Sequence, residues 1–224
     1  QKWDGSAAAT TIAGSPANAR YLCWHMNRMY VAGVAGKPNG FYFSDKGDVL
    51  TWPVDNLLYI PSIGGAITGF ASHSGRLFIF CQHAIFVMEG DPPILGEYLI
   101  SVFHALIGCD HPYTLSTLGT STAFTYQSDP MVLSGDIRLL SERTRGRVVA
   151  KAPASDQNAW AVLTPDHYAV GLSANSSVGS PAAATVGPLT LYVFERSRYQ
   201  CWSDWIYTTG AAMGATVPFQ ATVA

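Results

Sequence analysis

The sequence predicts an all-β fold, and within that class a β-propeller-like arrangement of about four to five antiparallel blades. Short runs of alternating apolar and polar residues recur along the chain, and turn-forming residues, among them 21 glycines and 13 prolines, separate them. Few stretches have a helical period. The best helical candidate, EYLISVFHALIG (97–108), is apolar nearly all round, so a buried strand pair competes with a helix there.

An internal repeat narrows the fold class to a propeller. The segment HMNRMYVAG (25–33) aligns with HSGRLFIFC (73–81), and both read His, two residues, Arg, an aliphatic residue and an aromatic residue. The two arginines, Arg28 and Arg76, are 48 residues apart. Blades of four strands repeat every 40 to 50 residues or so, because each blade is one supersecondary unit that packs on its neighbours.

Two weaker copies of the repeat extend the series. The third is GTSTAFTYQ (119–127), in which Ala123-Phe124 stands where the second copy has Leu77-Phe78, and the fourth is DQNAWAVLT (156–164). The segment GAAMGATV resembles the first strand of a further blade. Together the copies predict an N-terminal extension and a propeller-like domain with these bounds: extension 1–19, domain 20–224, blades at about 20–60, 64–103, 113–142 and 148–205, and the start of another at 210–224.

With about four to five blades, the chain is expected to be part of a larger propeller ring or to form an incomplete one. One blade cannot bury both of its faces alone, and a ring closes only when enough blades are present. Two segments interrupt the rhythm, at 35–40 and at 173–188. The second is rich in Ser, Ala, Gly and Pro, which indicates a surface loop where a subunit contact could form.

The charge content predicts a protein that works in an assembly. Charged residues make up 12% of the 224 residues, about half the usual share, and the net charge is −2. A surface so poor in charge is unusual for a free monomer. The near-neutral balance argues against specific nucleic-acid binding and against binding to a membrane surface, and an apolar run long enough for a membrane helix is not present in the sequence.

The N-terminus and the cysteines predict folding in a cytoplasm. The chain starts at Gln1 without a basic region and apolar core of the secretory type, and this start suggests a trimmed product. The four cysteines, Cys23, Cys81, Cys109 and Cys201, are scattered among strand-like segments. Buried free thiols are therefore favoured over a disulfide framework, which fits a reducing compartment.

The sequence gives only a weak signal for catalytic or metal-binding residues. It therefore predicts no catalytic, cofactor-binding or metal-binding residue and no cofactor. Cys23-x-His25 and Cys109-x-His111 each offer two zinc ligands where four are needed. His25 and His73 occupy the same repeat position, which favours a role in a turn or cap. A Gly-x-Ser-x-Gly elbow and a phosphate-binding loop are both missing from the sequence. The remaining polar candidates are predicted to lie in turns or at strand ends: Asp45, Asp48, Asp129, Asp136, His83, His104 and His167.

Two segments in the C-terminal half have charged or aromatic residues that alternate with other residues. Arg143, Arg145 and Arg147 would share one face of a strand, which favours a solvated edge or a subunit salt-bridge strip over a phosphate site. Trp202 and Trp205 flank a predicted Ser-Asp turn. Exposed tryptophans can bind sugars, but two in a hairpin usually pack between blades.

The stretch FYFSDKGDVLTW nearly matches the Asp-box of sialidase-type propellers, a Ser-x-Asp-x-Gly-x-Thr-Trp turn. No residue separates Ser44 from Asp45, and three separate Gly47 from Thr51, so the register fails twice. We expect Asp45 to accept hydrogen bonds from the backbone around Gly47, and Trp52 to fold back onto the blade. The stretch leaves open a carbohydrate-binding or sialidase-like propeller as the alternative function.

Four segments within residues 20–142 carry a family resemblance: NRMYVAG, GFYFSDKGDVLTW, GGAITGFASHSGRLFIFCQHAIFVMEGD and IGCDHPYTLSTLGTSTAFTYQSDPMVLSG. They resemble virion proteins of tailed bacteriophages, specifically tail nozzle or tail tubular proteins of short-tailed phages. The resemblance implies a structural, non-enzymatic subunit of a ring in the tail, tail hub or head–tail connector. Its expected partners are copies of itself, other tail or connector proteins, viral DNA that passes without specific binding, and a host surface. It implies a virion location, assembly in the host cytoplasm and no membrane insertion. Nozzle proteins are longer than this chain, so the chain is expected to be either a fragment of such a protein or a smaller virion component.

Overall fold

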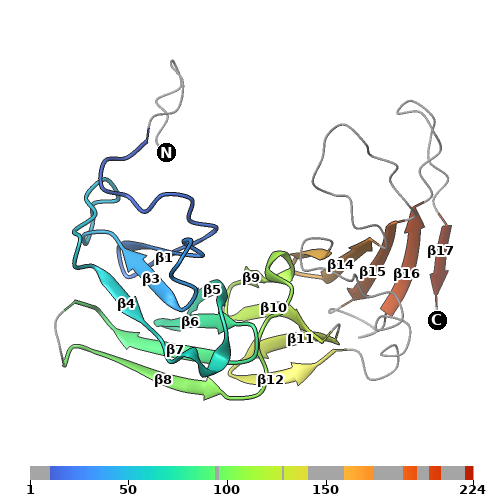
Figure 1. The fold of residues 1–224 in the computed structure, drawn as a ribbon. Helices are drawn as coiled ribbons and strands as arrows, with labels where there is room; N and C mark the ends of the chain where they lie inside the picture. Colours follow the sequence, from blue (N-terminus) through green and yellow to red (C-terminus); the bar gives the residue numbers. More distant parts are fainter. Residues whose placement is uncertain are drawn as a thin grey trace. The chain divides into compact units, whose positions relative to one another are not determined.

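The computed structural model is all-β, as predicted: in the residues it describes, the elements are antiparallel strands and two short 3-10 turns (Figure 1). The chain divides into two compact units, Gln1–Gly108 (unit 1) and Cys109–Ala224 (unit 2), which are described separately. The structure describes these residues: 11–93, 96–127, 129–140, 159–173, 189–195, 202–207 and 220–223.

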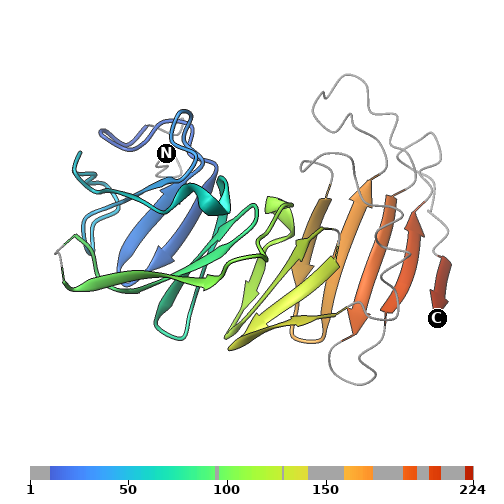
Figure 2. The ribbon, with the colours of Figure 1, turned by 60° about the horizontal axis from the view of Figure 1, so that its bottom comes forward.

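Unit 1 contains two four-stranded sheets, each a meander of consecutive strands, β1-β2-β3-β4 and β5-β6-β7-β8 (Figures 1 and 2). The single 3-10 turn described in this unit, η1, covers Ser62–Gly64. The strands have these bounds: β1 Tyr21–His25, β2 Arg28–Ala32, β3 Gly40–Phe43, β4 Leu57–Tyr59, β5 Ile67–His73, β6 Arg76–Cys81, β7 Ile85–Gly90 and β8 Tyr98–His104.

The repeat in unit 1 is a two-residue hairpin between the first and second strand of each sheet. His25 pairs with Arg28, and the two turn residues between them have positive φ angles of 45° and 61°. His73 pairs with Arg76 across Ser74 and Gly75, at 55° and 71°. Left-handed conformations at both turn positions match the twist of the flanking strands. The predicted equivalence of the first two copies is therefore confirmed.

The core of unit 1 lies between its two sheets. Buried side chains of the first sheet, from Tyr30 on β2 and Phe41 and Phe43 on β3, meet one face of the second sheet, and Phe41 and Phe70 make an edge-to-face contact with ring centroids 6.0 Å apart. Matching aromatic and aliphatic faces exclude water from both sheets, which is the main stabilising term. The second sheet contributes these residues: Ile67, Phe70, Leu77, Ile79, Cys81, Phe86 and Met88.

Unit 2 contains a four-stranded sheet, β9-β10-β11-β12, and a five-stranded sheet, β13-β14-β15-β16-β17. Its described core contains Ala123, Leu163, Tyr168, Val170 and Phe194. The elements have these bounds: η2 Pro112–Thr114, β9 Ser116–Leu118, β10 Ser121–Tyr126, β11 Asp129–Ser134, β12 Asp136–Leu139, β13 Ala159–Leu163, β14 His167–Ser173, β15 Leu189–Glu195, β16 Trp202–Tyr207 and β17 Gln220–Val223.

The predicted third and fourth copies of the repeat are misaligned. The turn in the third sheet is Gly119-Thr120, between paired Leu118 and Ser121, so Ala123 takes the place of Phe78, one residue earlier than predicted. In the fourth sheet the equivalent hairpin is the one between β13 and β14, where the amide of Thr164 donates to the carbonyl oxygen of His167. The predicted copy at 156–164 instead includes β13, the first strand of that sheet.

Two further expectations differ from the structure, and two predicted segments lie largely outside the described residues. The helical candidate 97–108 contains strand β8, in which Tyr98 and Ile100 pack against the core and Leu99 between them is exposed. β17 is hydrogen-bonded to β16 as the fifth strand of its sheet, within the segment expected to begin another blade. The segment 210–217 and most of the predicted loop 173–188 lie outside the described residues.

Candidate functional site

Buried polar side chains of unit 1 gather at the end of the sheets where the repeated hairpins turn. Arg28 donates from Nε to Asp91 Oδ1 at 2.7 Å and from a terminal nitrogen to the carbonyl oxygen of Ser44 at 2.9 Å. Lys46 Nζ lies 2.8 Å from the other oxygen of Asp91. The guanidinium also lies 5.6 Å from the ring centroid of Phe43, within cation–π range. The three charged residues form one cluster that joins the first sheet to the segment after β7.

The charge state of this cluster follows from its geometry. Burial alone would raise the pKa of Asp91, but the hydrogen bonds and charges of Lys46 and Arg28 outweigh it and hold the pKa below its usual value. The carboxylate is therefore ionised at neutral pH, and each of its oxygens faces a cation. A carboxylate held in this way is a poor proton acceptor. The cluster is suited to joining two sheets and unsuited to acid–base catalysis.

A serine and a histidine lie side by side next to this cluster. Nδ1 of His25, on β1, is 2.8 Å from Oγ of Ser72, on β5. The imidazole is almost fully buried, and burial lowers its pKa, so the ring is neutral near pH 7. Within the described residues, its Nε2 has no hydrogen-bond partner. The pair has the donor–acceptor distance of a nucleophile and base, and because the two residues come from different sheets, their hydrogen bond joins β1 to β5.

His73, the residue equivalent to His25 in the second copy of the repeat, is also buried, and its surroundings are apolar. Its ring stacks on Phe78 with centroids 4.5 Å apart, and Phe78 meets Phe103 edge to face at 5.3 Å. Burial lowers the pKa of His73 too, and in the described part of the chain neither ring nitrogen has a hydrogen-bond partner. Both histidines end a first strand beside the turn, which is where the repeat placed them.

The cysteines in the described residues are free thiols, as expected. Cys81 and Cys109 are buried and Cys23 is half-buried, while Cys201 lies outside the described residues. Burial raises the pKa of Cys23 to about 11 and that of Cys109 to about 12, so these thiols stay protonated. Cys109 donates to the carbonyl oxygen of His111 at 3.3 Å. Across the described ranges, three His, Cys, Asp or Glu side chains never gather closely enough to hold a metal ion.

The near-match to the Asp-box folds as a turn, but a different aspartate holds it. Asp48, and not Asp45, accepts the backbone amide of Leu50 at 2.8 Å and the hydroxyl of Thr51 at 2.7 Å. These two hydrogen bonds lower the pKa of Asp48. Trp52 donates from its indole nitrogen to the carbonyl oxygen of Val49 at 2.9 Å and is half-buried. The carbonyl oxygen of Asp45 does accept a hydrogen bond from the backbone beside Gly47, the amide of Asp48 at 3.2 Å, but the side chain that holds the turn belongs to Asp48.

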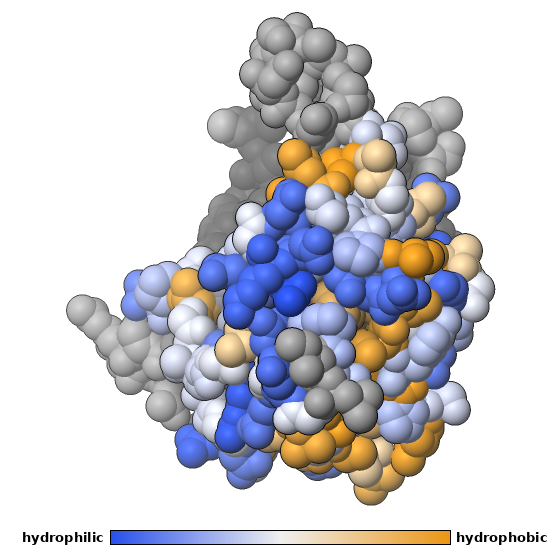
Figure 3. Space-filling view, turned by 90° about the vertical axis from the view of Figure 1, so that its left-hand side faces the viewer, coloured by the Kyte–Doolittle hydropathy of each residue, from blue (hydrophilic) through white to orange (hydrophobic). Residues whose placement is uncertain are grey.

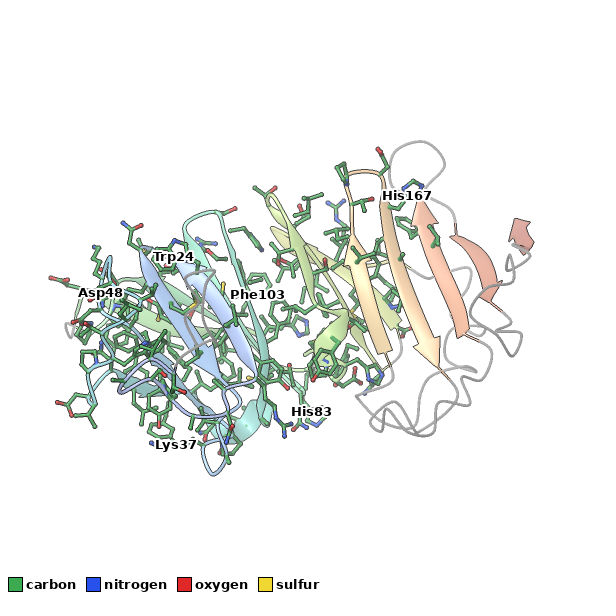
Figure 4. All side chains as sticks on the ribbon, turned by 90° about the horizontal axis from the view of Figure 1, so that it is seen from above. Trp24, Lys37, Asp48, His83, Phe103 and His167 are labelled. Atoms are coloured by element: carbon green, nitrogen blue, oxygen red, sulfur yellow. The ribbon has the colours of Figure 1, made fainter. Side chains whose placement is uncertain are left out.

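The predicted histidines His83 and His104 lie apart from the hairpin end. Figure 4 shows Trp24, which precedes His25 of the hairpin, toward one end of unit 1 and His83 toward the other. Nδ1 of His104 accepts the backbone amides of Leu106 and Ile107, at 3.3 and 3.0 Å, and so caps the turn after β8.

In unit 2, Asp136 accepts the amide of Ile137 at 2.7 Å, and Asp129 begins β11. The predicted Ser-Asp turn between Trp202 and Trp205 is wrong, because these residues lie within strand β16. The basic cluster at 143–147 lies outside the described residues.

Sequence reasoning missed Ser72 and Asp91, the partners of His25 and Arg28. They lie 47 and 63 residues away in sequence, so local spacing gives no signal for them. In comparisons with known proteins, no family model matches this chain, and no curated protein matches it either. A helix with the length and apolar character to cross a bilayer is not found among the described residues.

Proposed function

We propose that this chain is a structural, non-enzymatic subunit of a tailed-bacteriophage virion, part of a tail nozzle, tail hub or head–tail connector ring, and that its four sheets are blades of a β-propeller. Each sheet is a meander of consecutive strands, which is the topology of a blade. The first two sheets are related by the His-x-x-Arg hairpin. The phage-like stretch, residues 20–142, spans the first three sheets.

The observation that carries the proposal is the number of large apolar side chains exposed to solvent on a chain with little charge. A surface with 12% charged residues in the sequence and many exposed apolar groups favours association with other subunits. The side of unit 1 drawn in Figure 3 has several separate hydrophobic areas around a hydrophilic centre. The exposed residues are Leu22, Trp24, Met26, Leu50, Val54, Tyr59, Ile63, Leu99, Val102, Leu106, Tyr113, Leu118 and Val162.

The charge balance supports a channel wall for DNA. A net charge of −2 leaves no excess of Lys and Arg to hold phosphates, so DNA would pass through without specific binding. The partners are then copies of this chain and other tail or connector proteins, with host-surface contact at the tail end. The location is the virion tail, after assembly in the host cytoplasm.

Two measurements test the proposal. Mass spectrometry of purified phage particles should detect this chain at a fixed stoichiometry to the other tail proteins. Negative-stain electron microscopy of the purified protein should show rings of uniform size. Absence from particles, together with a monomer at every concentration, would refute the proposal.

A second candidate is a carbohydrate-binding or sialidase-like propeller, and the turn held by Asp48, Thr51 and Trp52 favours it. A sialidase needs arginines that converge on a substrate carboxylate. Arg28 and Arg76 are instead paired with Asp91 and Glu89. Binding on a glycan array, or turnover of a fluorogenic glycoside, would favour this candidate over the first.

A further inference from the structure

The first sheet of unit 1 has an apolar face on both sides. Its inner face carries Tyr30 and Phe41 into the core. Residues opposite each other on neighbouring strands share a face, so the register defines an outer face on the other side. We call this the outer face; it consists of Leu22, Trp24, Met29, Val31, Tyr42, Leu57 and Tyr59. Leu22 is 71% exposed, and Trp24 and Tyr59 are about half exposed.

In the second sheet, the face equivalent to the outer face is buried against another sheet. Counting from the repeated arginines, Met29 and Val31 are equivalent to Leu77 and Ile79. Leu77 and Ile79 are fully buried, in the same core as Tyr30. The second sheet therefore uses its equivalent of the outer face to receive the inner face of the first sheet. Packing between sheets runs head to tail, with two different faces in contact.

Unit 2 repeats this arrangement. Ala123, the equivalent of Tyr30, lies in one core with Tyr168 and Val170, the equivalents of Leu77 and Ile79. The opposite face of the last sheet, which we call the end face, is defined by the register as Val162, Ala169 and Val193. Within this face Val162 is about half exposed, Ala169 is half-buried and Val193 is buried. The first sheet of unit 1 thus presents one kind of face, and the last sheet of unit 2 presents the other kind.

We propose that the outer face of the first sheet binds the end face of a second copy of this chain, in the same head-to-tail manner as the sheets within each unit. The inference rests on the proposed function, because that function requires contacts between copies. A contact between two different faces is heterologous, and repeating it builds a ring or a filament. Leu99, Val102 and Leu106 lie outside both faces and are also exposed.

Single lysine substitutions test the two faces separately. Leu22→Lys and Val162→Lys each place a charge in the contact, and each should raise the dissociation constant of the wild-type oligomer by about tenfold or more. Leu106→Lys is the matched control, because Leu106 is 77% exposed and lies outside both faces. Trp24→Lys is a second variant on the outer face. Analytical ultracentrifugation measures the masses, and circular dichroism verifies that the variants fold.

Mixing the two variants is the decisive arm. Each variant keeps one intact face, so an equimolar mixture of Leu22→Lys and Val162→Lys should form a dimer of fixed mass that grows no further. An oligomer that neither substitution weakens would overturn the assignment of faces but leave the proposed function standing, which particle mass spectrometry tests independently. A wild-type monomer would also overturn the inference. Slow amide exchange in residues 21–32 would then indicate closure within the chain, and fast exchange a free face.

Discussion

Replacement of Arg28 by alanine should destabilise unit 1 strongly, by about 3 to 5 kcal/mol. The Arg28 side chain is 8% exposed, and it holds both the carboxylate of Asp91 and the carbonyl oxygen of Ser44. Its removal leaves a partly buried carboxylate with Lys46 alone, an exposed partner that contributes little. It also leaves a cavity beside the ring of Phe43 and an unpaired backbone acceptor. The cost is therefore that of breaking a buried network and exceeds that of one ion pair.

Arg76 provides the matched control, because it occupies the same position in the second copy of the repeat. It pairs with Glu89 at 2.6 Å, but its side chain is 52% exposed. Arg76→Ala should therefore cost less than about 1 kcal/mol, and added salt should reduce that cost further. Urea unfolding followed by tryptophan fluorescence gives both free energies. Equal losses for the two variants would refute the argument that burial sets the difference.

Two further predictions concern a backbone contact and the buried histidines. Gly90 and Gly36 both have positive φ, but a Cβ at Gly90 would overlap the carbonyl oxygen of Glu97, whereas a Cβ at Gly36 would meet nothing. Urea unfolding should show that Gly36→Ala costs about 1 kcal/mol of stability and that Gly90→Ala costs about 2 kcal/mol more. Lowered pKa values keep His25 and His73 neutral when folded, whereas unfolded histidine titrates near pH 6.5, so the unfolded chain binds more protons below that pH. The melting temperature should fall as pH drops below about 6.5, and His73→Phe should flatten that fall; an unchanged slope would contradict it.

The fold class and the first two hairpins could be predicted from sequence because their signal is local. Two-residue turns with Asn27 or Gly75 at a left-handed position stand between a histidine and an arginine in both copies. In the third and fourth sheets other residue types flank the turn, Leu118 and Thr164 among them, so the pattern no longer fixes the register. A shift of one residue then assigns Ala123 to the wrong face.

The candidate site could be predicted only in part for a different reason. The repeat marked His25 and Arg28, but their partners come from another sheet, and no spacing rule encodes a contact between sheets. At the turn after β3, the backbone amide of Asp45 donates to the carbonyl oxygen of Thr51, and the side chain of Asp48 accepts the hydroxyl of Thr51. Sequence alone did not determine which of the two aspartate side chains would hold the turn, because the choice depends on where the strand ends.

The polar cluster also predicts how the proposed contact between copies differs from the contact within unit 1. In the last sheet the equivalent of Arg28 is His167, and the residue of the first sheet equivalent to Asp91 is Gly47. The ion pair that joins the two sheets of unit 1 thus has no counterpart between the outer face and the end face. Association between copies should rest on apolar burial, and its dissociation constant should change little between about 50 mM and about 500 mM salt. Dissociation on raising the salt concentration would show that charges outside these faces hold the copies together.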